Sequence, residues 1–390
     1  MCGFQLFRPL TNSFFNLLYL CTTIWLLKDF MQHFHELIAT KVERLANRCT
    51  YIEFVIPEKL RAVFRYKQGQ YLTLRKMLDG QDIRRSYSIV NAPNEGSDTI
   101  GVLVKQIEGG KMSSWLYDHF KVGESLEVMP PMGHFHTHHH VKNSKTYVGI
   151  AAGSGISPVL SNLKQALFDE PNSRGILLYS NKCLGDTVFK QEIDTLEKQL
   201  EGRFKVVYLM TREGCSNPLF EGRISPTKLD LILEHLGIEV EKSTYFLCGP
   251  TEMIKTTSNY LSQEKKVPSL QVMYEYYSPP DDEDNAEKSD EFKALPNLES
   301  MVTLIIDDDE YSFHLNSKKK SILDQAIAEK LPVPFACKGG VCCTCKAQVL
   351  DGEVFMEKNF ALTSQEVENG YVLTCQCHPV TNVVLLNYDV

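Results

Sequence analysis

The 390-residue chain has no excess of basic residues, because 41 lysines and arginines stand against 49 aspartates and glutamates, for a formal charge of -8. A protein that binds a phosphate backbone presents a basic surface, so we expect no nucleic-acid partner. The sequence also has no internal repeat, and after residue 30 no apolar run approaches the length of a membrane span. A content of 43% hydrophobic and 23% charged residues excludes disordered and fibrous classes.

One stretch near the N-terminus raises the question of a membrane. Residues 9–27 carry no charge and are flanked by Arg8 and Lys28, a length that could just span a bilayer or serve as a signal anchor. Polar residues dilute this stretch, and no small-residue cleavage site follows it. We therefore expect residues 1–31 to be a hydrophobic extension that arises from start-site choice or acts as an anchor. We favour start-site choice over a membrane anchor, and we therefore expect the protein to be cytoplasmic.

The length exceeds what one hydrophobic core usually supports, so two or three domains are expected. Residues 32–142 hold short strand-like runs and one helical stretch, a pattern typical of an antiparallel β-barrel. Residues 143–277 alternate apolar strands with helical patterns, which predicts a parallel, doubly wound α/β sheet. Residues 278–298 combine prolines with carboxylates and no apolar period, which indicates a solvated acidic linker before a small unit over 299–390.

Cysteine is plentiful, and six of the twelve cysteines lie between Cys337 and Cys377. A secreted disulfide scaffold would spread pairs through a short chain, so this clustering indicates a metal centre in a reducing compartment. The run over residues 337–345 contains the spacing C-x4-C-x2-C, and a further cysteine follows after 29 residues. This is the plant-type pattern of a 2Fe-2S centre, whereas zinc ligands usually form two short pairs. We expect four iron ligands, with Cys343 and Cys377 as non-ligands; the ligands are Cys337, Cys342, Cys345 and Cys375.

A glycine-rich turn, GSGISP, follows the apolar strand predicted over residues 146–152. Glycines between a strand and a helix let the backbone approach a pyrophosphate, which the helix N-terminus then holds. The candidate nucleotide residues in this turn are Gly153, Gly155, Ser157 and Pro158. The fourth strand of the segment ends in Cys248, Gly249 and Pro250. Open parallel sheets bind ligands at such strand ends, so Cys248 either faces a nicotinamide or is a buried structural thiol.

The end of the second strand bears on the choice between NADH and NADPH. Where a carboxylate would hold the ribose of NAD, the sequence has Lys182, and no carboxylate appears before Asp186. Arg212 follows the third strand. An unpaired cation suits a 2'-phosphate, which favours NADPH, although a solvated loop lysine is the alternative for Lys182.

Two short strings in the barrel segment suit a flavin: RSYS at residues 85–88 and GKMS at residues 110–113, the latter at the start of the predicted helix. An arginine can pair with a diphosphate, a tyrosine ring can cover a flat heterocycle, and helix N–H groups can hold phosphates. The alternative is an ordinary barrel strand followed by an ordinary helix cap. A nicotinamide site joined to a one-electron centre also needs a converter between hydride and single electrons, and a flavin performs that chemistry.

In this order, the strings RSYS, GKMS, GSGISP and CGP and the final cysteine run resemble the ferredoxin-NADP reductase family fused to a C-terminal plant-type ferredoxin. The resemblance covers residues 34–390. It implies a multidomain fold made of an antiparallel β-barrel FAD domain, an α/β parallel-sheet NAD(P) domain and an α+β β-grasp ferredoxin domain. The cofactors that it implies are FAD, a 2Fe-2S cluster and NADPH or NADH.

The resemblance also implies roles for single residues. Arg85 would bind the FAD pyrophosphate with Ser86 beside it, Tyr87 would stack on the isoalloxazine, and Ser88 would lie near the hydride-accepting nitrogen. The FAD phosphates would be cradled by Gly110, Lys111, Met112 and Ser113, and the nucleotide would be bound by the residues at 153–158 and 248–250, with Lys182 and Arg212. Glu275 and Tyr277 match acidic and aromatic positions by the flavin, although phenylalanine is common at the second. The catalytic candidates are Ser88, Cys248 and Glu275.

Within the family, the sequence is most similar to reductase subunits of phenylacetyl-CoA epoxidases, which are multicomponent di-iron oxygenases. The strings that carry this similarity are VKQIEGGKMSSW, LEVMPPMGHF, FACKGGVCCTCKAQVLDGEV and GYVLTCQCHP. The N-terminal extension and Cys377 depart from the pattern. The resemblance implies an electron-transfer reductase that passes electrons from NAD(P)H through FAD and the cluster to such an oxygenase, in phenylacetate catabolism. Alternative acceptors are a fatty-acid desaturase, a ring-hydroxylating oxygenase or a hybrid-cluster protein, and a redox sensor is an alternative of another class.

Five histidines lie close together where the barrel segment ends. Such a run could bind a transition metal, and imidazole-rich loops also bind metals adventitiously. No matching cysteine or carboxylate stands nearby in the sequence, so we expect a solvated interdomain loop. The histidines are His134, His136, His138, His139 and His140.

Overall fold

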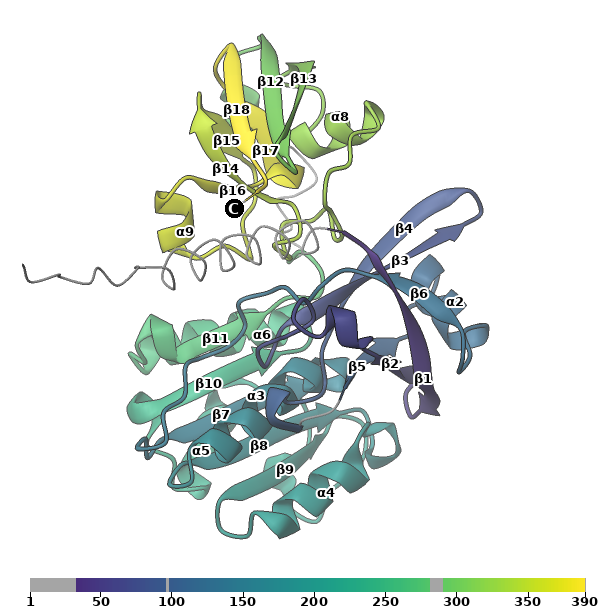
Figure 1. Cartoon of the computed structure of the whole chain (residues 1–390). Coiled ribbons are helices and arrows are strands. Elements are labelled where there is room, and N and C mark those ends of the chain that lie inside the picture. Colours follow the sequence, from purple (N-terminus) through teal and green to yellow (C-terminus); the bar gives the residue numbers. More distant parts are fainter. Residues whose placement is uncertain (1–32, 96–97, 281–289, 390) are drawn as a thin grey trace, which may run out of the picture.

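The computed structural model describes residues 33–95, 98–280 and 290–389. The prediction for residues 1–31 therefore falls outside the described residues. Three units follow one another along the described chain, and each has its own sheet (Figure 1). Within the described ranges, no helix is both long and apolar enough to cross a membrane.

The first unit is an antiparallel barrel, as the short strand-like runs predict. Its strands lie in the order β4-β3-β6-β1-β2-β5, and a bridge between Ile89 and Val102 joins the two ends of the sheet. Alternate residues of these strands point inward and form an apolar core that includes Leu37 and Phe54. The strands are β1 His35–Leu45, β2 Cys49–Val55, β3 Tyr71–Leu78, β4 Gln81–Ser88, β5 Thr99–Lys105 and β6 Ser125–Val128, and the helix is α2 Lys111–Asp118.

The second unit is a parallel sheet in the order β11-β10-β7-β8-β9, the doubly wound arrangement that the alternating pattern predicts. The strand order reverses between β7 and β10, and in open α/β sheets ligands bind at the carboxyl ends of strands at such a point. The strands are β7 Thr146–Ala152, β8 Arg174–Asn181, β9 Phe204–Met210, β10 Ser243–Cys248 and β11 Val272–Glu275. The helices are α3 Ile156–Asp169, α4 Lys190–Gln199, α5 Pro226–His235 and α6 Thr251–Asn259.

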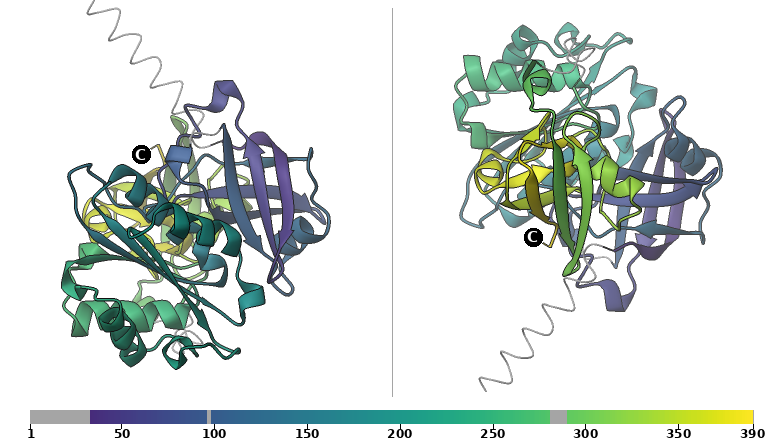
Figure 2. Two further views of the ribbon diagram at one scale, coloured as in Figure 1. Left: turned by 90° about the horizontal axis from the view of Figure 1, so that it is seen from below. Right: turned by 90° about the horizontal axis from the view of Figure 1, so that it is seen from above.

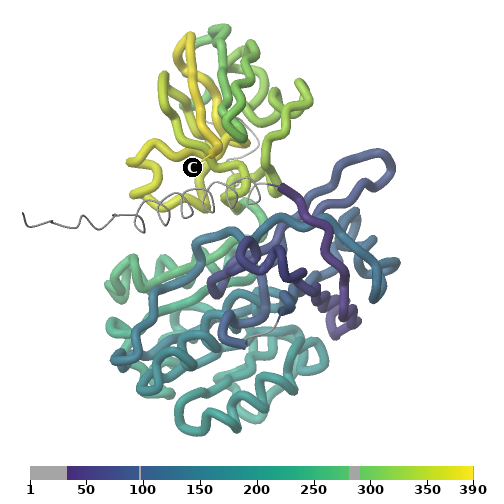
Figure 3. Tube along the Cα trace, in the orientation of Figure 1, coloured from purple at the N-terminus to yellow at the C-terminus, as the bar shows by residue number. Residues whose placement is uncertain are grey.

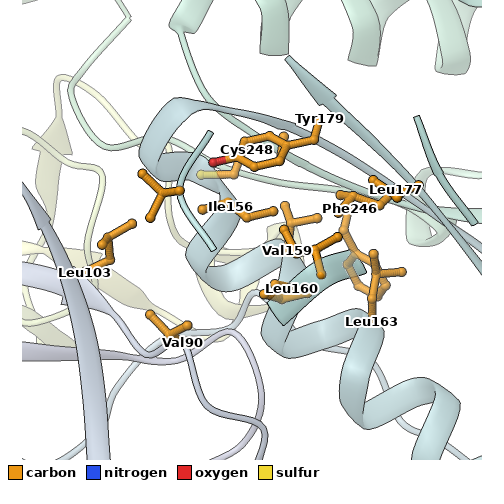
Figure 4. Packing of buried hydrophobic residues seen from close by; sticks show 14 of the residues in the cluster. Val90, Leu103, Ile156, Val159, Leu160, Leu163, Leu177, Tyr179, Phe246 and Cys248 are labelled. Carbon is orange, nitrogen blue, oxygen red and sulfur yellow. The ribbon is translucent and has the colours of Figure 1, made fainter. Parts of the chain in front are cut away.

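A shared apolar core joins the barrel to the parallel sheet. Val90 and Leu103 of the barrel belong to the same buried cluster as Ile156 and Leu160 of α3 (Figure 4). Polar contacts reinforce this packing, since the Ser161 hydroxyl donates to the Asn91 carbonyl at 2.7 Å and the Lys164 ammonium lies 2.8 Å from the Glu95 carboxylate. Buried apolar area of this kind fixes the position of the two units relative to each other.

The third unit is a mixed sheet in the order β13-β12-β18-β14-β16, with β12 and β18 parallel and a helix packed on the sheet. Seen from above, this unit lies over the junction of the other two (Figure 2). The strands are β12 Glu299–Ile306, β13 Asp309–Asn316, β14 Lys346–Asp351, β15 Val354–Met356, β16 Tyr371–Leu373, β17 Cys377–Pro379 and β18 Val383–Asn387, and the helices are α8 Ile322–Ala328 and α9 Ser364–Glu368.

Two sequence expectations need correction. Residues 278–298 are not wholly solvated, because helix α7, Asp290–Ala294, buries Phe292 edge-on against His378 with ring centroids 4.7 Å apart. The histidine run is not a simple solvated loop either. The His139 side chain is 3% exposed, and its Nδ1 lies 3.2 Å from Asp169. The sequence offered no sign of these partners, which lie far along the chain.

Candidate functional site

The predicted nucleotide turn lies where the parallel sheet reverses its strand order. A Cβ added to Gly155 would stand 2.2 Å from the Cys248 carbonyl oxygen, and Gly153 has a positive φ of 55°. A Cβ on Gly249 would meet the Met253 side chain at 2.7 Å. Only glycine fits where two strand ends approach so closely. The residues of GSGISP and CGP, about a hundred positions apart in the sequence, are thus in backbone contact.

The start of helix α3 carries the rest of the predicted turn. The Ser157 hydroxyl is buried and donates to the Ser154 carbonyl at 3.2 Å, so this side chain closes the turn. Pro158 lies in the first turn of α3, where a missing N–H costs least. No side chain caps the N-terminus of α3. The turn therefore offers backbone N–H groups and a positive helix end to a pyrophosphate.

Lys182 and Arg212 lie side by side at the carboxyl ends of β8 and β9. The Arg212 N–H donates to the Lys182 carbonyl at 2.8 Å, and both side chains are exposed. Glu213, next to this pair, accepts the Leu184 N–H at 2.6 Å. The two cations are therefore available to an anionic group at this edge of the sheet.

The three catalytic candidates come together from three separate strings. The Ser88 hydroxyl donates to Glu275 Oε2 at 2.7 Å, and Glu275 is the register partner of Cys248 in the parallel pair β10–β11. The Tyr277 hydroxyl donates to the Ser154 carbonyl at 3.2 Å, which ties this aromatic ring to the nucleotide turn. The barrel string, the turn and the two strand ends thus form one continuous site.

Burial determines the protonation states of Glu275 and Cys248. Loss of water around the carboxyl raises the pKa of Glu275 to about 7, although the hydrogen bond from Ser88 lowers it. Burial, with the nearby Glu275 carboxyl, raises the pKa of the Cys248 thiol well above its usual value. Cys248 is therefore a neutral thiol, and Glu275 is a group that can hold or release a proton near neutral pH.

The string RSYS lies on β4. Arg85 is exposed, and its guanidinium donates to the Arg84 carbonyl at 2.7 Å. In the described part of the chain no carboxylate forms an ion pair with it, whereas Arg84 pairs with Asp82. The Tyr87 ring packs on the barrel core. The Ser86 hydroxyl is bonded to Thr73 at 3.1 Å, so this residue joins two strands of the barrel.

The string GKMS forms the N-terminus of α2. Gly110 is the N-cap, and no side chain bonds to the first-turn N–H groups. A Cβ at Gly110 would stand 2.6 Å from Ser113 Oγ. Lys111 Nζ donates to Gln81 Oε1 at 2.7 Å, while the Met112 side chain belongs to the barrel core. The uncapped helix end fits the diphosphate of a dinucleotide.

The four predicted iron ligands form two pairs of thiols. The Cys342 Sγ lies 3.1 Å from the Cys337 Sγ, and Cys345 hydrogen-bonds to Cys375. In the described residues, no three His, Cys, Asp or Glu side chains gather around a single point. The Cys342 thiol, with the backbone N–H of Gly339 at 3.3 Å, lowers the pKa of the Cys337 thiol below its usual value. Two thiol pairs with N–H groups at the sulfurs fit a centre of two irons.

The two extra cysteines of the cluster region point elsewhere. Cys377 is fully buried, and its thiol donates to the Leu373 carbonyl at 3.2 Å. The Cys343 thiol donates to the Ala361 carbonyl at 3.7 Å. Both lie in the apolar core of the third unit, as Cys345 and Cys375 also do, so their assignment as non-ligands stays a prediction from the cysteine spacing.

The cysteine loop packs against the barrel, which the sequence did not reveal. The Tyr71 hydroxyl accepts the Cys343 N–H at 3.2 Å, and the trace of the third unit meets the chain near the start of β3 (Figure 3). The Arg84 guanidinium lies 3.9 Å from the centroid of the Phe335 ring. No motif marks these residues, because Tyr71 and Arg84 lie in ordinary strand patterns. A cleft of about 1050 Å³ beside them is lined by Arg75, Arg84, Arg85 and residues 330–338.

Comparison with known families agrees with this arrangement. Residues 37–137 match the oxidoreductase FAD-binding domain, residues 150–259 match the oxidoreductase NAD-binding domain, and residues 304–380 match the 2Fe-2S iron-sulfur cluster binding domain. The FAD, NAD(P)H and 2Fe-2S cofactors expected from the sequence are thus confirmed.

Whole-chain relatives share the same order of domains. A component of 1,2-phenylacetyl-CoA epoxidase from Escherichia coli is 34% identical over 92% of this chain and 99% of its own length. The ferredoxin reductase component of 3-ketosteroid-9-alpha-monooxygenase from Rhodococcus rhodochrous is 30% identical over 90% of this chain and 95% of its own. Phthalate dioxygenase reductase shares the fold, with a TM-score of 0.55 and 21% identity over 91% of this chain and 98% of its own.

The Rhodococcus relative is the ferredoxin reductase component of a monooxygenase, the Escherichia coli relative is a subunit of an epoxidase, and both alignments cover nearly the whole chain. The resemblance drawn from the sequence motifs is therefore confirmed. The chain belongs to the family of NAD(P)H-dependent oxygenase reductases that combine an FAD-binding domain, an NAD-binding domain and a C-terminal 2Fe-2S domain.

Proposed function

We propose that this reductase passes electrons from NADPH to a di-iron oxygenase of the phenylacetyl-CoA epoxidase type. The proposal rests on one observation: the flavin string RSYS lies on β4, and the end of the parallel sheet and the cysteine loop both contact the paired strands β3 and β4. Ser88 of β4 contacts Glu275 at the end of β11, beside Cys248, while Tyr71, the register partner of Ser88 in β3, contacts the cysteine loop. Electrons that arrive at one side of this strand pair have a short path to the other.

The flavin is held, in this proposal, between β4 and the start of α2. Arg85 and the uncapped N-terminus of α2 bind the diphosphate, and the Tyr87 ring covers one face of the isoalloxazine. Ser86, Lys111 and Met112 position these elements through their side-chain contacts. A bound flavin supplies the conversion of a two-electron hydride into single electrons.

The nucleotide is held by the turn at 153–158 and the strand end at 248–250. Cys248 and Tyr277 border the nicotinamide end, and Ser88 keeps the Glu275 carboxyl in place beside it. Lys182 and Arg212 bind the 2'-phosphate at the other end. Cys337, Cys342, Cys345 and Cys375 hold the cluster as two ligand pairs.

The phenylacetyl-CoA epoxidase assignment rests on the 34% identity with the Escherichia coli epoxidase component over nearly the full length of both chains. A further whole-chain relative belongs to a 3-ketosteroid-9-alpha-monooxygenase. Mixing the purified reductase with the oxygenase part of an epoxidase, and separately with a ketosteroid oxygenase, distinguishes the acceptors. Oxygenation supported only by the second mixture would contradict the assignment.

Replacing one proposed iron ligand separates flavin reduction from electron delivery. We expect Cys342→Ser to remove electron delivery to an external one-electron protein acceptor while flavin reduction by NADPH stays within about twofold of the wild-type rate, because the nucleotide and flavin contacts are unchanged. The matched control is Cys343→Ser, a neighbouring thiol that faces the core. Iron and sulfide analysis accompanies both variants, and an equal loss of both activities in Cys342→Ser would contradict transfer in series.

Removing a strand-end cation is expected to change nucleotide preference. Lys182→Ala and Arg212→Ala should each raise the KM for NADPH by about tenfold and leave the KM for NADH nearly unchanged, since a charge-assisted contact to a phosphate is worth about 1.5–3 kcal/mol. Lys198→Ala, an exposed lysine of α4, is the control for loss of one positive charge. Equal changes for both nucleotides would exclude the 2'-phosphate role.

The raised pKa of Glu275 predicts a pH-dependent stability. The folded protein holds this proton up to about pH 7, whereas the unfolded chain releases it near its ordinary value, so the ionised carboxyl disfavours folding as the pH rises through this window. Thermal midpoints measured from pH 5 to pH 8 should therefore shift in favour of Glu275→Gln over wild type as the pH increases. A constant difference across that range would show that Glu275 titrates normally.

A further inference from the structure

Tyr71 is held rigidly at the first position of β3. Its N–H donates to the Met132 carbonyl at 2.8 Å, the Met132 N–H donates back at 3.1 Å, and Ser88 is its register partner on the other side. The side chain is 5% exposed. A Cβ at Gly133 would lie 3.1 Å from two ring carbons, so the backbone itself packs against the ring. The ring direction is therefore set by the barrel.

The hydroxyl of this ring reaches the cysteine loop of the third unit. It accepts the Cys343 N–H at 3.2 Å and lies 3.2 Å from Thr344 Oγ1. The two hydroxyls share one hydrogen bond in which either oxygen can be the donor, and the Tyr71 proton is free to point to Thr344 while its oxygen accepts the backbone N–H. The barrel thus satisfies a backbone donor of the loop and orients a side chain within it.

Thr344 continues this contact toward a ligand sulfur. Thr344 stands two positions after Cys342 and directly before Cys345, and its hydroxyl favours the thiolate form of Cys342, as a donor beside that sulfur does. When Thr344 accepts from Tyr71, its single proton is free for the Cys342 sulfur. In that arrangement the three residues connect β3 to one of the proposed iron ligands.

We propose that Tyr71 is a positioning residue for electron transfer: it fixes the cysteine loop on the barrel and, through Thr344, strengthens the hydrogen bond to the Cys342 sulfur. Hydrogen bonds to ligand sulfurs stabilise the more negative, reduced form of an iron-sulfur centre and raise its reduction potential. One electron leaves the reduced flavin and one enters the cluster, while Tyr71 keeps its proton and is not oxidised. The inference rests on the cluster ligands proposed above.

Other contacts hold the two units together without a hydrogen bond to a cysteine. Arg84 donates to the Val333 carbonyl at 3.3 Å and stacks on Phe335, and the Tyr276 and Phe360 rings pack edge-on with centroids 6.0 Å apart. Docking therefore does not depend on Tyr71 alone. Loss of its hydroxyl can be examined in a protein that keeps its three units together.

The test uses full-length Tyr71→Phe protein with its cofactors bound. Iron, sulfide and flavin contents and the rate of flavin reduction by NADPH should match the wild type. The midpoint potential of the cluster, titrated by electron paramagnetic resonance, should fall, and cluster reduction after flavin reduction should slow by about tenfold, the scale of one hydrogen bond. Tyr51→Phe is the control, because it removes another buried barrel hydroxyl, bonded to Glu53, without touching the loop.

The hydrogen-bond chain predicts how variants combine. Thr344→Val should lower the potential by a similar amount, the double variant should add little to either shift, and Thr344→Ser should restore the wild-type value. An unchanged potential in Tyr71→Phe protein of full cluster content, or additive shifts in the double variant, would overturn the inference. Wild-type protein without two irons and two sulfides would instead refute the proposed cluster ligands, a separate failure.

Discussion

The pairing of β3 with β4 is the constraint on which the rest of the structure depends. These strands run antiparallel, with Tyr71 opposite Ser88 at one end and Leu78 opposite Gln81 at the other. At one end of the pair, Ser88, which contacts Glu275, therefore lies opposite Tyr71, which contacts the cysteine loop. Because ladder hydrogen bonds fix the register, neither contact can shift without the other. The short path between the two redox sites is a property of this register.

Two kinds of interface join the three units: one is a shared apolar core, and the other consists of a few directional contacts. The barrel and the parallel sheet share one buried apolar core, which is suited to a permanent arrangement (Figure 4). The third unit meets the barrel through a small cluster around Tyr71, Ala336 and Cys342, together with an arginine stacked on an aromatic ring. The units that match the FAD-binding and NAD-binding domains are thus joined by extensive packing, whereas the cysteine loop is positioned by a few directional contacts.

The sequence predicted the architecture well because each unit has its own pattern of apolar residues: short strand-like runs in the barrel, and strands alternating with helices in the parallel sheet. The strand predicted over residues 146–152 coincides with β7, and the turn residues Gly153 and Gly155 lie where the strand order reverses. The approach of Gly155 to Cys248 was implied only by the resemblance, since no spacing rule relates residues so far apart.

Contacts between units were beyond sequence reasoning. Tyr71, Thr344 and Arg84 belong to ordinary strands or lie inside the cysteine motif, and their partners come from other domains. The burial of Phe292 and His139 was missed for the same reason: a residue in a polar segment gives no sign of an aromatic partner 86 positions away or of a carboxylate 30 positions away. Local patterns predict elements, whereas these interfaces depend on how the elements are assembled.

The central claim is that electrons cross within one chain, from the nucleotide side of the β3–β4 pair to the cysteine loop. Anaerobic rapid mixing with NADPH, followed by flavin absorbance and by the paramagnetic signal of the reduced cluster, tests it most directly. The account predicts that the flavin is reduced before the cluster, and that the rate constant of cluster reduction is independent of protein concentration. A cluster signal that precedes flavin reduction, or a rate that rises in proportion to protein concentration, would contradict it.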